Sequence, residues 1–139
     1  MTWASSLRRG GWIALTEIDD LFGHEPLSDR TKAVFRAYAE EALEAGRYDF
    51  HMGRKLAGYL DESGFTDLNV FTLADLEFCF AGAASSDVLD GWKTRFERMK
   101  LLQQFCGTKF EQVRDEFLTC LKRPDHTSKT AVCVCIGRM

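Results

Sequence analysis

The stretch Leu7–Asp20, LRRGGWIALTEIDD, passes from two arginines through two glycines into an apolar run and then into acidic residues. The pair Gly10-Gly11 is typical of a tight turn. Trp12–Leu15 then continues without a polar residue, which is typical of a strand that is buried on both faces. We expect three acidic side chains where this strand ends, namely Glu17, Asp19 and Asp20.

The composition is that of an ordinary globular protein. The chain has 139 residues, of which 45% are hydrophobic and 28% are charged, and its formal net charge is −3. This length predicts one domain over residues 1–139. The charge argues against binding to nucleic acid or to a membrane surface, and no run approaches the roughly 20 apolar residues of a membrane span.

The five cysteines are an odd number, and they form no C-x-x-C pair. This usage is typical of reduced thiols in a cytoplasmic protein rather than of a disulfide framework. The pair Arg8-Arg9 does not begin an export signal, because the apolar run after it is far too short. We therefore expect a soluble cytoplasmic protein.

Beyond the first strand, helical and strand patterns alternate along the chain. Apolar residues recur at three- and four-residue spacing in the helical segments, and alternating or β-branched residues mark the strands. In order, the expected segments are a helix from Ser28 or Asp29 to Ala45, a helix from Asp49 to Ser63, a strand Phe65–Leu73, a helix Asp87–Cys106, a helix Thr108–Leu121 and a strand Thr130–Ile136.

Two passages resemble class I S-adenosylmethionine-dependent methyltransferases. The glycine pair after Leu7-Arg8-Arg9, followed by an apolar strand and Glu17, resembles the entry to the fifth strand of that family. The passage Leu56–Asp67, with its helix, Gly-Phe pair and strand, resembles the approach to the sixth strand. The order of elements extends this resemblance over almost the whole chain, although Arg9 stands where the family commonly has proline.

The resemblance implies an α/β fold with a small mixed sheet of about three strands. Their implied order is first, third, second, with the last strand antiparallel, and about four helices pack with them. This is half of a Rossmann-like methyltransferase fold, the C-terminal, acceptor-side half. The resemblance thus also implies a chain that is truncated relative to that family and lacks the cofactor-binding N-terminal half.

The family binds its cofactor mainly through that first half, with a glycine-rich turn after the first strand. No two of the 11 glycines here are separated by a single residue, so the chain contains no G-x-G motif. We therefore expect the isolated chain not to bind S-adenosylmethionine and to have no cofactor. A methyltransferase activity would require a partner that supplies the cofactor site.

The second half of such an enzyme shapes the pocket of the methyl acceptor. The resemblance therefore implies a substrate pocket at the end of the first strand and in the loop after it, with help from the helix that carries Trp92. The implied pocket residues are Glu17, Asp19, Asp20, Phe22, His24 and Trp92.

Each of these residue types also has a purely structural interpretation. Acidic residues at a strand end are common at a solvated loop entry, and an aromatic stripe such as Trp92 with Phe96 and Met99 is typical of a core. His24 could act as a base. His51 and His126 lie far from it in sequence without ligand spacing, so we expect no metal site.

Three functional hypotheses follow. The first, which we favour, is a non-catalytic small-molecule-binding or interaction protein derived from the acceptor half of a methyltransferase. The second is one subunit of a split methyltransferase whose cofactor-binding half is a separate chain. The third is a truncated relic or scaffold with an unrelated activity.

The first strand also predicts self-association. In the family, the fifth strand is paired on both sides, and this chain contains no equivalent of the fourth strand. An apolar strand with an open edge invites pairing, and a symmetric homodimer is the commonest closed solution. The interface residues that we expect are Trp3, Trp12 and Ala14. The alternative is that Met1–Ser6 folds back over this edge and the protein stays monomeric.

Overall fold

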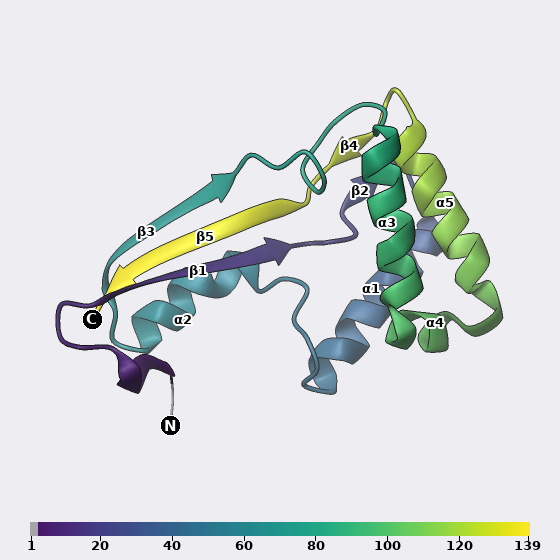
Figure 1. Cartoon of the computed structure of the whole chain (residues 1–139). Helices are drawn as coiled ribbons and strands as arrows, with labels where there is room; N and C mark the ends of the chain where they lie inside the picture. Colours follow the sequence, from purple (N-terminus) through teal and green to yellow (C-terminus); the bar gives the residue numbers. More distant parts are fainter. Residues whose placement is uncertain (1–2) are drawn as a thin grey trace. The chain divides into compact units, whose positions relative to one another are not determined.

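The computed structural model describes residues 3–139, which form two compact units (Figure 1). The first unit contains the chain up to Leu21 together with Phe50–Ala74 and Ala131–Met139. The second contains Phe22–Asp49 and Asp75–Thr130. Among the described residues, no helix is long and apolar enough to cross a membrane. The expectation of one domain over residues 1–139 stays a prediction.

The first unit is built on a three-stranded sheet. Its strands are β1 (Trp12–Asp19), β3 (Thr66–Leu73) and β5 (Ala131–Arg138), in the order β1-β5-β3. β5 is antiparallel to both neighbours, so β1 and β3 run parallel to each other. The predicted mixed α/β fold, with the last strand antiparallel between the other two, is confirmed.

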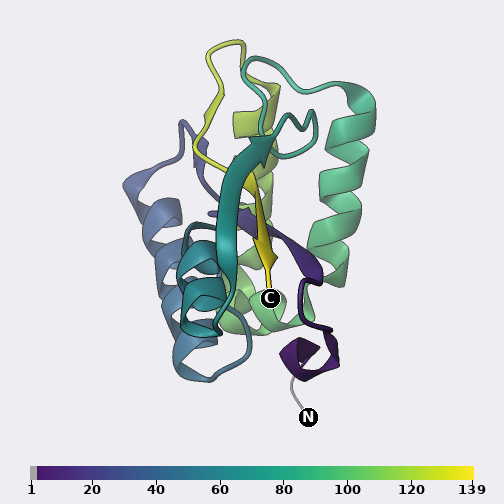
Figure 2. The ribbon, with the colours of Figure 1, turned by 90° about the vertical axis from the view of Figure 1, so that its left-hand side faces the viewer.

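One face of this sheet is covered by helix. The short 3-10 helix η2 (Gly53–Lys55) leads into α2 (Leu56–Glu62), which packs beside the strands (Figure 2). Leu56 and Leu60 of α2 are buried against Phe65 and Cys135. Partly buried side chains complete this core, namely Leu7, Ile13, Leu15, Met52, Ala57, Leu68, Cys133 and Met139.

The expectation that β1 is buried on both faces is wrong. Exposure alternates along the strand, so that Ile13 and Leu15 are half-buried while Ala14 and Thr16 are exposed. Trp12 is 66% exposed. The reason is that α2 covers only one face of the sheet, and an apolar run alone cannot distinguish a strand covered on one face from a strand covered on both.

The face away from α2 carries exposed side chains from both outer strands. Residues paired across antiparallel strands lie on the same face. Thr16 and Phe71 both pair with Val134 of β5, while Ala14 pairs with Ile136. We call the exposed residues of this face the sheet surface, and they are Trp12, Ala14, Thr16, Asn69, Phe71, Leu73 and Arg138.

The turn before β1 forms as its glycines predict. Gly10 has a positive φ of 79°, and the N–H of Gly11 donates to the carbonyl of Arg8 at 2.8 Å. A residue with a side chain is strained at that φ. Before this turn, the 3-10 helix η1 spans Trp3–Ser6.

The second unit is mostly helical. It contains α1 (Asp29–Glu44), α3 (Ser86–Arg98), α4 (Lys100–Cys106) and α5 (Phe110–Lys122), with the 3-10 helix η3 (Gly107–Lys109) before α5. A two-stranded ribbon pairs β2 (His24–Glu25) with β4 (Thr127–Ser128). The hydroxyl of Ser28, one of the two residues at which this helix was expected to begin, caps α1 by accepting from the N–H of Thr31.

Two local expectations in this unit are wrong. The helix expected over Asp87–Cys106 is interrupted at Met99, whose ψ of 66° separates α3 from α4. The segment after β1 is not all loop, because His24 belongs to β2. The apolar spacing continues through Met99, so the pattern did not reveal the interruption.

Candidate functional site

Asp19, one of the acidic residues predicted for the substrate pocket, closes β1 in an ion pair with Arg54. Nε of Arg54 lies 3.0 Å and Nη2 lies 2.8 Å from Oδ2 of Asp19. The backbone N–H of Arg54 also donates to Oδ1 at 3.1 Å. The Asp19 side chain is 9% exposed, whereas that of Arg54 is 59% exposed.

Gly53 makes this arrangement possible. A Cβ atom at Gly53 would lie 2.7 Å from Cβ of Asp19 and 3.0 Å from Sγ of Cys133. Real Cβ atoms do not approach other side chains so closely, so a glycine lets η2 lie directly against the end of β1. The first turn of η2 thereby places the backbone N–H of Arg54 next to the carboxylate of Asp19.

The Asp19–Arg54 pair is a structural anchor that holds η2 against the end of β1. The bidentate guanidinium and one backbone N–H occupy both oxygens of Asp19. The hydrogen bond to Asp19 raises the pKa of Arg54, and the negative charges of Asp19 and Asp20 act in the same direction. An oxygen already bound in this way is a poor receptor for a cationic or hydroxyl-bearing substrate.

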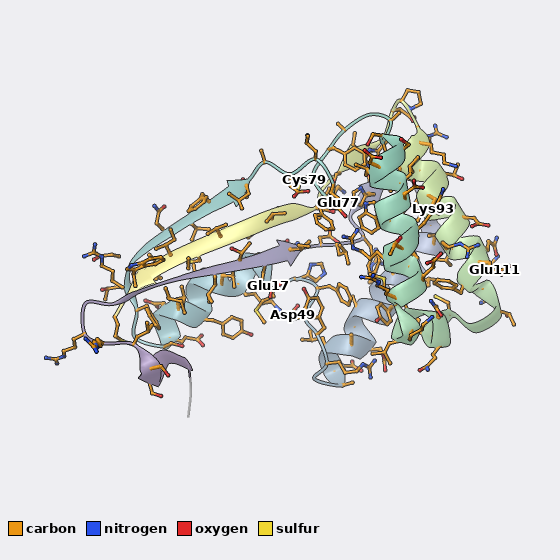
Figure 3. The ribbon with its side chains drawn as sticks, viewed as in Figure 1. Glu17, Asp49, Glu77, Cys79, Lys93 and Glu111 are labelled. Carbon is orange, nitrogen blue, oxygen red and sulfur yellow. The ribbon has the colours of Figure 1, made fainter. Side chains whose placement is uncertain are left out.

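The other two predicted acids lie beside this anchor in sequence. Glu17 is inside β1 rather than at its end, and it pairs with Cys133 (Figure 3). Asp20 follows the strand with a φ of 54°, and its N–H donates to the carbonyl of Phe50 at 2.8 Å. The first strand therefore ends four residues after its apolar run Trp12–Leu15, and the expected cluster at its end is smaller.

His24 lies in the core of the second unit and forms a pair with His126. Nδ1 of His24 is 2.9 Å from Nε2 of His126, and the rings stack with an interplanar angle of 12°. Each histidine is 1% exposed. Nδ1 of His126 is 2.9 Å from the carbonyl oxygen of Gly82, and Nε2 of His24 is 3.3 Å from the hydroxyl of Thr130.

The partners determine which nitrogens carry protons. A carbonyl only accepts, so Nδ1 of His126 is the donor to Gly82, and its Nε2 accepts from Nδ1 of His24. Nε2 of His24 is then left to accept from the Thr130 hydroxyl. This series of hydrogen bonds satisfies the nitrogens of both rings in their neutral form.

Burial enforces that neutral form. Desolvation, reinforced by the neighbouring His126, lowers the pKa of His24 from 6.5 to about 3. Desolvation also lowers the pKa of His126, although its hydrogen bond to Gly82 opposes the shift. Neither ring is positioned as a solvent-accessible general base at neutral pH, and both serve as hydrogen-bonding parts of a core.

Phe22 and Trp92 lie in the same core as His24. The ring centroid of Phe117 lies 6.2 Å from that of Phe22, 5.3 Å from that of His24 and 4.9 Å from that of Trp92. Trp92 has no exposed surface, and its indole N–H donates to the carbonyl of Glu77 at 3.0 Å. The structure therefore brings these three predicted pocket residues together as packed side chains.

The sequence pattern did not predict some of the residues that build these arrangements. Arg54 and Phe117 carry no motif, and His126 is 102 positions from His24. The adjacent Gly53-Arg54 pair was a possible signal for the anchor, because a glycine often marks a close backbone approach. Among the described residues, no group of three His, Cys, Asp or Glu side chains could hold a metal ion.

The predicted interface residues lie in the first unit. Trp12 and Ala14 are exposed on β1, and β1 is an outer strand of the three-stranded sheet. Trp3 belongs to η1, and its side chain lies outside the described part of the structure.

Comparisons with known proteins give matches only among solved structures. No family model and no curated protein matches this chain. Among solved structures, a match is the Haemonchus contortus phospholethanolamine N-methyltransferase 2 in complex with phosphomonomethylethanolamine and S-adenosylhomocysteine. The identity is 15% and the TM-score is 0.38, over 97% of this chain and 28% of that chain.

This chain therefore spans 28% of the length of that methyltransferase. The similarity is distant, and it assigns neither an activity nor a substrate to this chain. That the chain corresponds to the C-terminal half of a methyltransferase stays a prediction.

Proposed function

We propose that this chain is a non-catalytic interaction protein, and that the sheet surface and the outer edge of β1 form its contact site for another protein. The observation that carries the proposal is the exposure of large apolar side chains on that face. Trp12 is 66% exposed, Leu73 is 45% exposed and Phe71 is 40% exposed. Phe71 and Leu73 are neighbours on β3, and Trp12 lies on the other outer strand. Exposed apolar patches are typical of protein interaction sites, and aromatic residues are enriched in interface cores.

The position of these residues in the sheet supports the proposal. They lie on the two outer strands, and the register places them on one face. Helix α2 of the first unit, together with η2 before it, packs on the other face (Figure 1). A partner that covers this face would complete a layered arrangement in which helix or sheet lies on both sides.

The residues predicted for a substrate pocket support an interaction role over catalysis. The carboxylate of Asp19 is occupied by Arg54, and His24 and Trp92 are packed inside the second unit. In addition, the sequence has no glycine-rich cofactor turn. A chain of this kind would act by binding, and any methyl transfer would depend on a cofactor site from elsewhere.

The experiment compares capture of partners by three tagged forms of the full chain in its native host. The forms are the wild type, a Trp12→Lys/Phe71→Lys variant of the sheet surface, and a Leu101→Lys control. Leu101 is 48% exposed on α4 and lies outside the sheet surface. We expect a partner that the wild type and the control retain and the sheet-surface variant loses. Circular dichroism verifies that all three are folded.

The same preparations are tested for S-adenosylmethionine binding by calorimetry. We expect no binding by the isolated chain. Retention of the same partners by all three forms would overturn the interaction site. One-to-one binding of the methyl donor by the isolated chain would overturn the non-catalytic role. A captured partner that itself binds the donor would identify the chain as a subunit of a split methyltransferase.

A further inference from the structure

We infer that the partner of the β1 edge is a second copy of this chain, paired antiparallel about a twofold axis at Ala14. This inference rests on the proposed function and names the occupant of its site. It would join two three-stranded sheets into one six-stranded sheet with β1 of each copy at the centre.

Half of the backbone groups of β1 face away from β5, and no strand among the described residues pairs with them. The N–H of Met139 donates to the carbonyl of Gly11 at 2.9 Å, which makes these two residues a bonded cross-strand position. Bonded and non-bonded positions alternate along antiparallel strands. The residues whose N–H and C=O groups face away from β5 are therefore Trp12, Ala14, Thr16 and Ile18.

The two edges of the sheet differ in their protection. β3 has a register shift between Thr66 and Asn69, and Asp67 there has a φ of 52° and is exposed. A bulge with a charged residue is a common device against edge-to-edge pairing. β1 pairs with β5 over eight consecutive positions without a shift, and its outward residues are all uncharged. The open edge is therefore β1.

The charge pattern of the stretch favours a second copy in antiparallel orientation. The exposed Arg8 and Arg9 precede β1, whereas Asp19 is its last residue and Asp20 follows it. Antiparallel pairing brings the basic end of each copy to the acidic end of the other, whereas parallel pairing would bring like charges together. Unlike charges on facing patches select the correct partner and orientation.

The side chains distinguish between registers. With the axis at Ala14, Trp12 lies opposite Thr16 of the second copy and Ile13 lies opposite Leu15, so no charged residue faces an apolar one. With the axis at Leu15, Ile13 would lie opposite Glu17. Ala14 of each copy is the diagonal neighbour of the other copy's Trp12, and its small side chain leaves room for that ring, which has exposed surface to bury.

The experiment uses sedimentation velocity of the full chain from about 1 to about 300 μM, the range suited to a small, weak interface. We expect the wild type to dimerise and both Ala14→Lys and Ala14→Glu to be monomeric, because each places like charges opposite each other at the axis. An equimolar mixture of the two variants should form the dimer again. The control Thr72→Lys, which places a charge on the opposite edge strand β3, should dimerise like the wild type.

The mixture keeps the test valid even if one variant is less stable, because recovery of the dimer requires folded chains and complementary charges at one position. A wild type that stays at one chain mass over the whole range would overturn the homodimer. Equal dimerisation by Ala14→Lys and the wild type would overturn the β1 contact. Monomeric behaviour together with capture of a different protein through the sheet surface would reject the second copy and leave the proposed function intact.

Discussion

Nδ1 of His24 lies 2.9 Å from Nε2 of His126, and both rings are sealed in the core of the second unit. His24 lies in β2, and His126 directly precedes β4, the strand with which β2 pairs. The bond from His126 to the carbonyl of Gly82 extends the connection to the segment before α3. This polar connection requires two neutral rings, so it makes the stability of the unit depend on pH.

We expect the free energy of unfolding to fall as the pH is lowered from 6.5 towards 3. The folded pKa of His24 is about 3, below its ordinary value of 6.5, so in this window the unfolded chain binds the proton more readily. The contribution is complete above pH 6.5 and is lost as the pH falls. From pH 7.5 to 5, His24 alone should cost roughly 2 kcal/mol, measured by urea unfolding.

The matched control is His24→Gln/His126→Asn, which keeps polar groups but removes both titrating rings. Its stability at pH 7.5 should be lower than that of the wild type, and its loss between pH 7.5 and 5 should be smaller. An equal loss in both proteins would show that the histidine pair is not the cause. The carboxylates whose pKa is lowered, such as Glu116, act mainly below pH 4.5, which is outside the interval from pH 7.5 to 5.

Gly53→Ala should destabilise the first unit by about 1–3 kcal/mol, the usual cost of an overpacked site. The new Cβ would lie 2.7 Å from Cβ of Asp19, so η2 or the end of β1 must move. Gly58→Ala is the control, because Gly58 lies in α2 with nothing within 4 Å of the added atom. It should stabilise by about 0.5–1 kcal/mol through helix propensity. Equal effects in chemical unfolding would contradict the close approach at Gly53.

Asp19→Ala should cost about 1–3 kcal/mol, the usual range for hydrogen bonds to a charged group. The carboxylate is nearly buried and receives both the guanidinium and the backbone N–H of Arg54. Asp61→Ala, at an exposed position on α2, should change stability by less than about 0.5 kcal/mol. If both variants unfold at the wild-type urea concentration, the anchor role of Asp19 is wrong.

Phe117→Ala should destabilise the second unit by about 3–5 kcal/mol, the usual cost of removing a buried aromatic ring. Phe117 has no exposed surface. In addition to Phe22, His24 and Trp92, it packs against Phe35 and Phe96, with ring centroids 5.6 Å and 5.3 Å away. Loss of near-ultraviolet circular dichroism should accompany the change. Phe105→Ala, which removes a ring that is 41% exposed, should have a much smaller effect. Similar losses would contradict the central position of Phe117.

Local signals in the sequence were sufficient for most elements. Ser28 caps α1 where its hydroxyl can reach the N–H of Thr31, and Gly10 forms the turn before β1 because it tolerates a positive φ. The strand order β1-β5-β3 followed from the resemblance to methyltransferases, since the order of elements along the chain is characteristic of that family. These features depend on a few neighbouring residues or on chain order.

The sequence by itself thus determined which segments are helical, apart from the interruption at Met99, and it located the turn at Gly10 and the three strands of the mixed sheet. Only the tertiary structure decided that Asp19 is bound by Arg54, that His24 pairs with His126, and that Trp12 is exposed. Each of these depends on groups far apart in the chain, or on which face a helix covers. The type and spacing of a residue indicate how well it tolerates burial. Its neighbours in space determine whether a carboxylate is bound by an arginine, whether an imidazole is neutral and whether an indole is exposed.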